Sequence, residues 1–290
     1  MNVSKSSLLA VAWLFVFVSF QPVNGVTIRD DQPDSDYLAL GALSDFSAVG
    51  TFVGGLTGSG TLIAPDWVLT AAHLILGASS GTFTINGSSY TSTKIITDPA
   101  WNGNVYSGND FALVHLSSPI AAIPPAMLYT GTSEFGQVGT FVGNGFTGTG
   151  LTGFNTALGN QKRAFQNMID GDFGLPLLVY AADFDNPHDT NASGFGSVFP
   201  LTLEGCVTPG DSGGAVFIQQ GSQYYLEGVI STVGYLDGSP NGSYSDASGF
   251  GRISAALPWI NSTVSVSEPS SYALFITSGV ALIFFNRRKN

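Results

Sequence analysis

The stretch that decides the fold is Gly210-Asp211-Ser212-Gly213-Gly214, a serine enclosed by glycines. A serine hydroxyl is a weak nucleophile at its own pKa and becomes reactive only beside a base that takes its proton. The glycines allow a sharp bend and let a substrate approach main-chain N–H groups without an intervening Cβ. A Gly-rich hairpin would explain any one of the glycines but not all five residues together. The pattern predicts Ser212 as a nucleophile, with the N–H groups of Gly210 and Ser212 converging on a developing oxyanion.

Two further segments supply the partners that such a serine needs. The sequence Thr-Ala-Ala-His at residues 70–73 follows an apolar run, so His73 emerges from the end of a buried strand with small residues beside it. Asp110 directly precedes the apolar strand at residues 111–116, where its carboxylate can accept the Nδ1–H of the histidine. The order His73, Asp110, Ser212 therefore predicts a general base, an orienting carboxylate and a nucleophile.

This order, with its three local signatures, resembles the chymotrypsin-like (trypsin superfamily) serine proteases across most of the mature chain. Residues 58–63 (GSGTLI) and residues 258–260 (PWI) agree with the resemblance. It implies an all-β fold of two antiparallel six-stranded β-barrels, with the active site in the cleft between them and a short C-terminal helix. It also implies a secreted or surface-associated serine endopeptidase that acts through an acyl-enzyme. Asp211 is then expected in a buried ion pair that sets the geometry of the oxyanion hole.

Composition favours the same fold class. The 37 glycines and the short apolar runs between turn residues are typical of antiparallel barrel strands. No strong helical periodicity precedes Ser254. We expect the protease domain at residues 26–262, with one barrel at about 36–125 and a second at about 135–255.

Cofactor chemistry receives no support from the sequence. One cysteine and three widely spaced histidines cannot assemble a zinc set, and the glycines at residues 143–153 do not open a helix of a βαβ unit. No metal or cofactor is expected. His115 lies within a strand and His188 lies in a loop, and both are interpreted as structural.

The primary specificity pocket is expected to lack a charge. In trypsin-type members of the family, an aspartate six residues before the nucleophile selects Lys or Arg, and here that position is Cys206. A substrate Lys or Arg would be buried without a counter-charge, which is costly, so we expect cleavage after apolar or small residues. The expected pocket residues are Cys206, Ser231 and Val233. Glu204 lies close in sequence and supplies a charge only if the loop is shifted.

The N-terminal residues 1–25 read as a signal peptide, with Lys5 before an apolar core and a small residue at the end. The segment predicts export, and a cut by signal peptidase after Gly25 would create a new Val26 ammonium. Many family members begin with Ile-Val-Gly-Gly, which is absent here. One hypothesis is that the Val26 ammonium pairs with Asp211. The alternative is that residues 26–36 form a flexible acidic leader and that main-chain donors or another cation satisfy Asp211.

Residues 267–290 resemble a PEP-CTERM sorting signal, which exosortases process. Ser-Glu-Pro-Ser at residues 267–270 takes the place of the Pro-Glu-Pro that is usual in such signals. An apolar segment follows at residues 272–285, and a basic cluster ends the sequence. The apolar segment is shorter than the roughly 20 residues that normally span a bilayer. The alternatives are a plain C-terminal membrane anchor or a glycosylphosphatidylinositol signal. Membrane contact is expected through this segment alone, before processing.

Charge and cysteine content narrow the partners. A net charge of −11 argues against binding to nucleic-acid phosphates, so the expected partner is a protein or peptide substrate. Cys206 is the only cysteine, which excludes an intrachain disulfide. Animal members of the family that the chain resembles carry several, so the resemblance implies a bacterial type stabilised by core packing. The rival interpretation is a catalytically silent cell-surface binding or adhesion domain on the same fold.

Overall fold

The computed structural model describes residues 25–156, 161–173, 179–239 and 241–264. Nearly all of the predicted signal peptide, and the whole predicted sorting segment at residues 267–290, lie outside these residues. Among the helices in the described ranges, none has the length and apolar character needed to cross a membrane.

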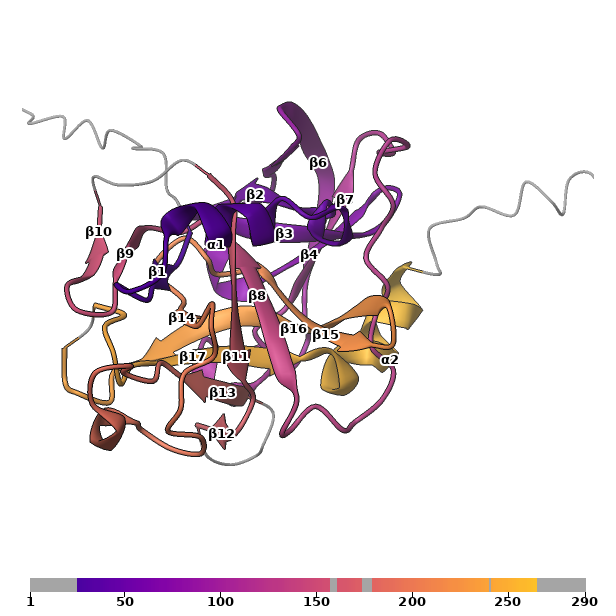
Figure 1. Cartoon of the computed structure of the whole chain (residues 1–290). Helices are drawn as coiled ribbons and strands as arrows, with labels where there is room; N and C mark the ends of the chain where they lie inside the picture. The colour runs from indigo at the N-terminus through magenta and orange to yellow at the C-terminus, as the bar shows by residue number, and fades with distance from the viewer. Residues whose placement is uncertain (1–24, 157–160, 174–178, 240, 265–290) are drawn as a thin grey trace, which may run out of the picture.

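Six antiparallel strands of the first half close into a barrel (Figure 1). In barrel order these strands are β2 (Val49–Val53), β3 (Thr57–Ala64), β4 (Trp67–Thr70), β7 (Ala112–Leu116), β6 (Ser88–Thr97) and β5 (Thr82–Ile85). Strand β4 is buried along its whole length, which explains why it reads as an unbroken apolar run that ends in threonine. The register pairs Thr70 at the end of β4 with Ala112 at the start of β7. The residues after β4 and before β7 therefore leave the barrel at the same rim.

The second half is a half-barrel, built as a seven-stranded antiparallel sheet. In sheet order its strands are β11 (Arg163–Met168), β8 (Val138–Gly143), β15 (Ala215–Gln220), β16 (Gln223–Gly234), β17 (Ala247–Arg252), β13 (Val179–Asp183) and β12 (Gly171–Asp172). The predicted all-β, two-barrel class is confirmed, with the refinement that the first half closes and the second half curves without closing in the described residues.

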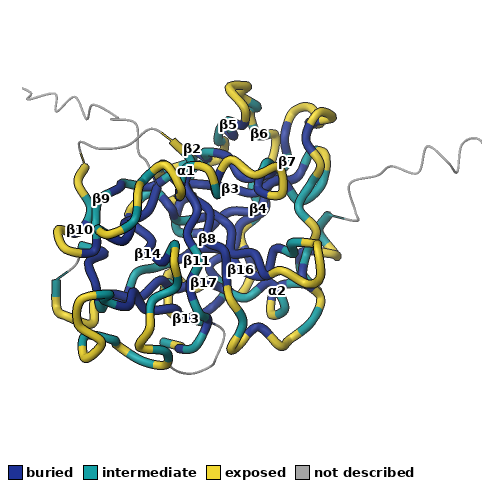
Figure 2. The backbone as a smooth tube through the Cα atoms, in the orientation of Figure 1, coloured by how far each residue is buried: buried dark blue, intermediate teal, exposed yellow. Residues whose placement is uncertain are grey.

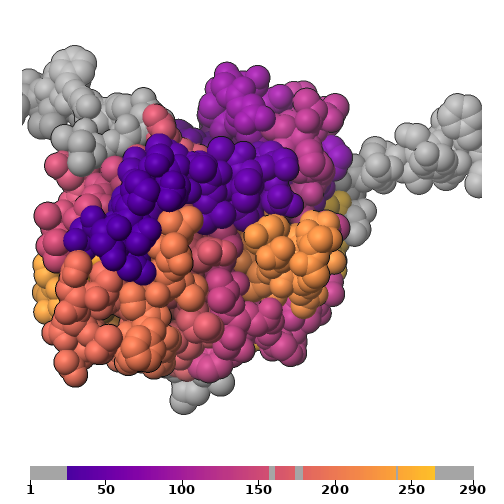
Figure 3. Space-filling model, in the orientation of Figure 1, coloured from indigo at the N-terminus to yellow at the C-terminus, as the bar shows by residue number. Residues whose placement is uncertain are grey.

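A smaller four-stranded sheet ties the N-terminal segment to the second half. Its order is β10 (Gly153–Asn155), β9 (Thr147–Thr149), β1 (Thr27–Ile28) and β14 (Gly205–Cys206). Strand β1 pairs parallel with β9 and antiparallel with β14. In Figure 3 the indigo N-terminal residues lie on the surface against the orange residues of the second half. The flexible-leader alternative is therefore wrong for the residues of β1.

Two α-helices lie among the described residues. The predicted C-terminal helix is α2 (Ile253–Val264), which packs on β16 and β17. Helix α1 (Asp34–Gly41) packs on β11 and was not expected. Its apolar residues do not follow a helical period, so the signals that remain are Pro33 before it and two aspartates in its first turn.

The core runs through both halves (Figure 2). One hydrophobic cluster fills the closed barrel and continues onto β15, β16 and α2. A second cluster lies in the second half, where Phe141 stacks on Phe165 with ring centroids 4.7 Å apart and meets Phe250 edge-on at 5.6 Å. Since the first cluster reaches strands of the second half, packing fixes the two halves relative to each other.

Candidate active site

His73 and Asp110 meet at the rim where β4 and β7 leave the barrel. His73 lies in the 3₁₀ helix Ala72–Leu74 that follows β4, and Asp110 is buried just before β7. Asp110 Oδ2 lies 2.6 Å from His73 Nδ1, and Asp110 Oδ1 accepts the main-chain N–H of His73 at 2.8 Å. A carboxylate can only accept, so Nδ1 carries the proton and Nε2 has a free lone pair. One carboxylate thus orients both the ring and the backbone of the histidine.

Ser231, on β16, is a third member of this cluster. Its hydroxyl donates to Asp110 Oδ2 at 2.6 Å, so the second half of the molecule also holds the carboxylate. The sequence predicted Ser231 only as a pocket residue. No local signal marks the contact, because Ser231 lies 121 positions from Asp110 along the chain.

The turn that carries Ser212 is fixed between the two halves. The main-chain carbonyl of Ser212 accepts from Ser59 N on β3 at 2.7 Å, and Gly213 N donates to Ile230 O on β16 at 2.8 Å. Gly213 has φ of +79°, and a Cβ there would overlap the Ser59 carbonyl oxygen. Only glycine fits this position.

The reactive groups of this turn are unengaged. Within the described residues, neither the Ser212 hydroxyl nor the N–H groups of Gly210 and Ser212 make a hydrogen bond to protein, His73 included. Catalytic hydrogen bonds are often long before substrate binds and tighten in the Michaelis complex. The two N–H groups remain available to an incoming carbonyl oxygen.

Asp211 points away from this surface into the core. Its Oδ1 accepts from Gly145 N at 2.7 Å, and its Oδ2 accepts from Thr208 N at 2.8 Å and from Val26 N at 3.2 Å. Burial raises the pKa of Asp211 to about 6, and these hydrogen bonds oppose the shift. Main-chain donors and the Val26 nitrogen both reach the carboxylate, so elements of both alternatives considered from the sequence are present.

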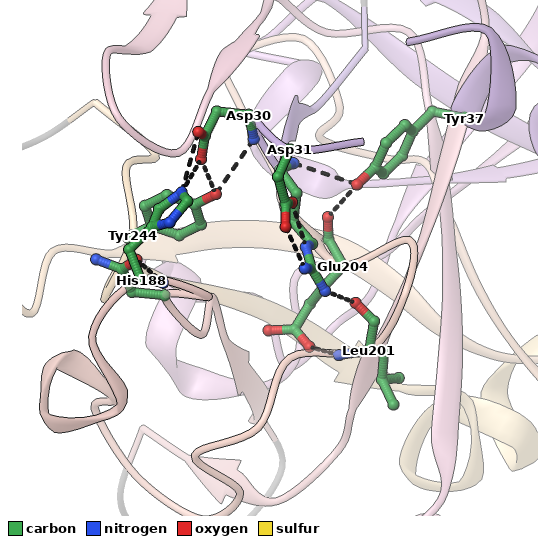
Figure 4. A network of polar contacts seen from close by, with 9 residues as sticks. Asp30, Asp31, Tyr37, His188, Leu201, Glu204 and Tyr244 are labelled. Atoms are coloured by element: carbon green, nitrogen blue, oxygen red, sulfur yellow. Dashed lines mark hydrogen bonds and ion pairs between the residues drawn. The ribbon is translucent and has the colours of Figure 1, made fainter. Parts of the chain in front are cut away.

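Polar contacts anchor the residues that follow β1 (Figure 4). The Arg29 guanidinium binds Asp31 and donates to the carbonyl of Leu201 at 2.6 Å. Asp30 accepts from the Tyr244 hydroxyl and lies 3.0 Å from His188 Nε2. His188 therefore ties the N-terminal segment to the second half.

His115 also lies outside the His73 cluster. Its Nε2 is 3.1 Å from Asp66, its Nδ1 is 2.8 Å from Thr93, and its ring packs on Trp67. None of these three contacts involves His73, Asp110 or Ser212.

A cavity of about 210 Å³ adjoins Ser212. Ser231 and Val233, both predicted pocket residues, line it together with Thr208 and Pro209. Cys206 does not line it: the thiol is fully buried, 3.5 Å from the Ser248 hydroxyl, and burial raises its pKa. No carboxylate borders this cavity among the described residues.

Glu204 does not supply the missing charge. Its carboxyl oxygens accept from Asp185 N at 2.7 Å and Leu201 N at 2.6 Å, and burial raises its pKa to about 8. Figure 4 shows the side chain beside Leu201, in the network that anchors the N-terminal segment. The shifted-loop alternative is therefore wrong.

A second hollow, of about 490 Å³, adjoins His73 and is lined partly by Ile95 and Trp101. Depressions thus border both His73 and Ser212, as a site for an extended chain requires. In the described part of the chain, no three His, Cys, Asp or Glu side chains are grouped to hold a metal ion.

A closed β-barrel and a half-barrel that bring a histidine, a buried aspartate and a glycine-flanked serine to one rim define the class of chymotrypsin-fold serine endopeptidases. The chain belongs to the trypsin-like peptidase family: the trypsin-like peptidase domain model matches residues 58–223. It is similar to chymotrypsin-like elastase family member 1 of Canis lupus familiaris, with 28% identity over 236 residues that cover 72% of this chain and 81% of the relative. The same protein of Bos taurus is 29% identical over 232 residues, which cover 72% and 79% of the two chains.

The protein is therefore a serine endopeptidase, and its substrates are proteins or peptides. This result favours the enzyme over the silent binding or adhesion domain considered from the sequence.

Proposed function

We propose that Ser212 is the nucleophile, His73 the general base and acid, and Asp110 the orienting carboxylate. His73 Nε2 takes the hydroxyl proton as Ser212 Oγ attacks the scissile carbonyl carbon, and the N–H groups of Gly210 and Ser212 stabilise the oxyanion. His73 then gives the proton to the leaving amine, and an acyl-enzyme remains. Water, deprotonated by His73, attacks the acyl carbon and releases the second product.

The observation that carries this proposal is the pair of contacts from one buried carboxylate to His73. Asp110 accepts from both the ring Nδ1 and the main-chain N of the histidine, which fixes the tautomer that leaves Nε2 as a base. The unengaged N–H groups of Gly210 and Ser212 support the oxyanion assignment.

Alanine variants of the two proposed catalytic residues test it. Ser212→Ala and His73→Ala should each lower kcat by about 10⁴-fold or more, since such residues act as a unit. Ser193→Ala and His115→Ala are matched controls, because both side chains bond elsewhere in the fold. Peptide hydrolysis and thermal melting are measured for all four. Activity of Ser212→Ala within tenfold of the parent would refute the assignment.

We propose that cleavage follows apolar or small residues. The cavity beside Ser212 is lined without a carboxylate among the described residues, and Cys206 is buried behind its wall. A substrate Lys or Arg would enter it without a partner for its charge. A peptide-library cleavage profile is the measurement. Preferential cleavage after Lys or Arg would show that this pocket is misassigned.

We propose that export activates the enzyme. Val26 N already lies 3.2 Å from Asp211 Oδ2 in the uncut chain, where it belongs to the Gly25–Val26 peptide. Cleavage by signal peptidase after Gly25 converts this amide into an ammonium in contact with a buried carboxylate. Asp211 then forms a charge-assisted hydrogen bond with the Val26 ammonium, and this bond fixes the turn at Gly210 and Ser212 from the core side.

The remaining proposals concern the domain boundaries and the C-terminal segment. We propose residues 26–262 as the protease domain, with barrels at about 36–125 and 135–255. We propose residues 267–290 as a PEP-CTERM-like segment that an exosortase processes or that anchors the bacterial protein at the membrane. N-terminal sequencing and the intact mass of exported protein decide both processing sites.

A further inference from the structure

Residues 210–212 form the turn that carries the two proposed oxyanion donors, and we call it the oxyanion turn. Its role in the reaction rests on the proposed function. The peptide unit between Gly210 and Asp211 separates the two proposed oxyanion donors, so its orientation sets the direction in which they point. Gly210 has φ of +99°, a conformation that glycine adopts freely and leaves easily. At one end of this peptide, Asp211 N donates to Thr208 O at 3.0 Å. At the other end, Gly210 O accepts from the hydroxyl of Ser59 at 3.1 Å.

Ser59 is fully buried on β3, and its hydroxyl makes every hydrogen bond that a hydroxyl can make. It donates to Gly210 O and accepts from Asn144 N at 3.1 Å and from Asn144 Nδ2 at 3.4 Å. Both groups of Asn144 can only donate, so the single hydroxyl proton must point to Gly210 O.

The amide of Asn144 is itself oriented by the barrel. Its Nδ2 also donates to Gly50 O on β2 at 3.3 Å, and a carbonyl oxygen accepts only from the nitrogen side of an amide. Asn144 directly follows β8 of the second half, whereas Gly50 and Ser59 belong to the closed barrel. The chain of contacts thus joins both halves of the molecule to the oxyanion turn.

We infer that Ser59 and Asn144 are positioning residues of the reaction. Asn144 aligns the Ser59 hydroxyl, and the hydroxyl holds the Gly210 carbonyl away from the place where the oxyanion forms. With this bond removed, the peptide at Gly210 and Asp211 rotates more freely, and the two donors no longer converge. Neither residue touches substrate, and both act through the main chain of Gly210.

The test compares Ser59→Ala, Asn144→Ala, the double variant and Ser193→Ala with the parent. The Ser193 hydroxyl also lies within hydrogen-bond distance of main-chain carbonyls, of Phe195 at 3.3 Å and Ser197 at 2.9 Å, and of Asp183 Oδ2 at 3.1 Å, in a loop that makes none of the contacts above. Active sites are first titrated with a fluorophosphonate, so that all rates refer to folded enzyme. For Ser59→Ala we expect kcat to fall about 10- to 100-fold, less than the 10²–10³ that follows removal of a donor. KM should stay within threefold.

Inhibition by a peptide aldehyde separates positioning from a purely structural role. The aldehyde forms a tetrahedral adduct, so its inhibition constant should rise in proportion to the fall in kcat, while Ser193→Ala leaves both unchanged. Because the two residues act as one unit, the double variant should be no slower than the slower single variant. Additive losses would contradict the chain of contacts.

Labelling of the parent enzyme separates failure of the positioning role from failure of the proposed function. A parent enzyme that is not labelled at Ser212 would overturn the proposed function and this inference together. A parent that is labelled, with Ser59→Ala at unchanged kcat and aldehyde affinity, would overturn the positioning role alone, even with a lowered melting temperature. If Ser59→Ala does not fold, the same comparison with Asn144→Ala decides the question.

Discussion

Asp110 shows how much of this site depends on single hydrogen bonds. Its carboxylate is buried and accepts from two groups of His73 and from the hydroxyl of Ser231. A buried carboxylate without full hydrogen bonding is costly, so the three contacts hold it in one orientation. The Ser231 hydroxyl and the Nδ1 of His73 each lie 2.6 Å from Asp110 Oδ2, and these are the two shortest of the three contacts.

Ser231→Ala should therefore lower kcat about tenfold or more, because a hydrogen bond to a charged group contributes roughly 1.5–3 kcal/mol. Asp110 becomes freer to rotate, and the imidazole loses part of its alignment. Steady-state kinetics on a peptide substrate measures the effect, with Ser193→Ala as the control. An unchanged kcat in the folded variant would show that Ser231 only lines the pocket.

Local sequence predicted the proposed catalytic residues but not the residues that position them. His73, Asp110 and Ser212 each stand in a short signature, and the structure brings the first two into contact and places the third on the adjoining turn. Ser59 and Ser231 lie in ordinary strand sequence, and their contacts join segments far apart in the chain. Such contacts follow from the tertiary register, which no local pattern encodes.

Val26, the residue before strand β1, has a strained backbone when it is joined to Gly25. Val26 is β-branched and has φ of +58°, a conformation that costs about 1–3 kcal/mol for such a residue. The torsion is defined by the Gly25–Val26 peptide, so cleavage of that bond removes the strain. The proposed cleavage would also turn the contact between Val26 N and Asp211 into an ion pair.

Processing after Gly25 should therefore raise both stability and activity. Protein that begins at Val26 should melt at a higher temperature than protein with one extra residue before Val26. The extended form should also hydrolyse peptides more slowly, because its amide cannot neutralise Asp211. Differential scanning calorimetry and kinetics on the two forms provide the comparison. Full activity with the extension would reject the pairing.

The elements themselves were predictable where a strand is buried along all or nearly all of its length. Strand β4 and strand β7 were evident as apolar runs bounded by turn residues. Helix α1 was missed because it is short and lacks apolar periodicity, and its packing on β11 decides its conformation. Strand β1 was missed for a related reason, since two residues in a sheet leave no pattern to detect.

At the scale of the whole molecule, the net charge of −11 includes carboxyls that the fold has buried. Burial raises the pKa of Asp170 to about 6, of Asp185 to about 7 and of Glu204 to about 8, and Asp183 adds to each shift by repulsion. In the unfolded chain these groups titrate near pH 4. At pH values between about 4 and the raised pKa of each group, the folded state binds more protons than the unfolded state. The free energy of unfolding therefore falls as pH rises through this range.

The melting temperature should therefore fall as pH rises from about 5 to about 8, because the folded state must release protons that the unfolded state has already lost. Glu204→Gln, which cannot ionise, should flatten the upper part of this dependence. Asp36→Asn, at an exposed carboxylate of α1, is the control. A melting temperature that rises steadily across this range would contradict the buried-acid account.

The central claim, that this fold presents Ser212 as an activated nucleophile, is tested most directly by a fluorophosphonate probe. The probe forms a covalent bond with a serine only where a base and an oxyanion site activate it. The account predicts stoichiometric labelling of residues 26–262, mapped by mass spectrometry to Ser212 and lost in His73→Ala. Folded protein that takes up no label, or label on a serine other than Ser212, would contradict it.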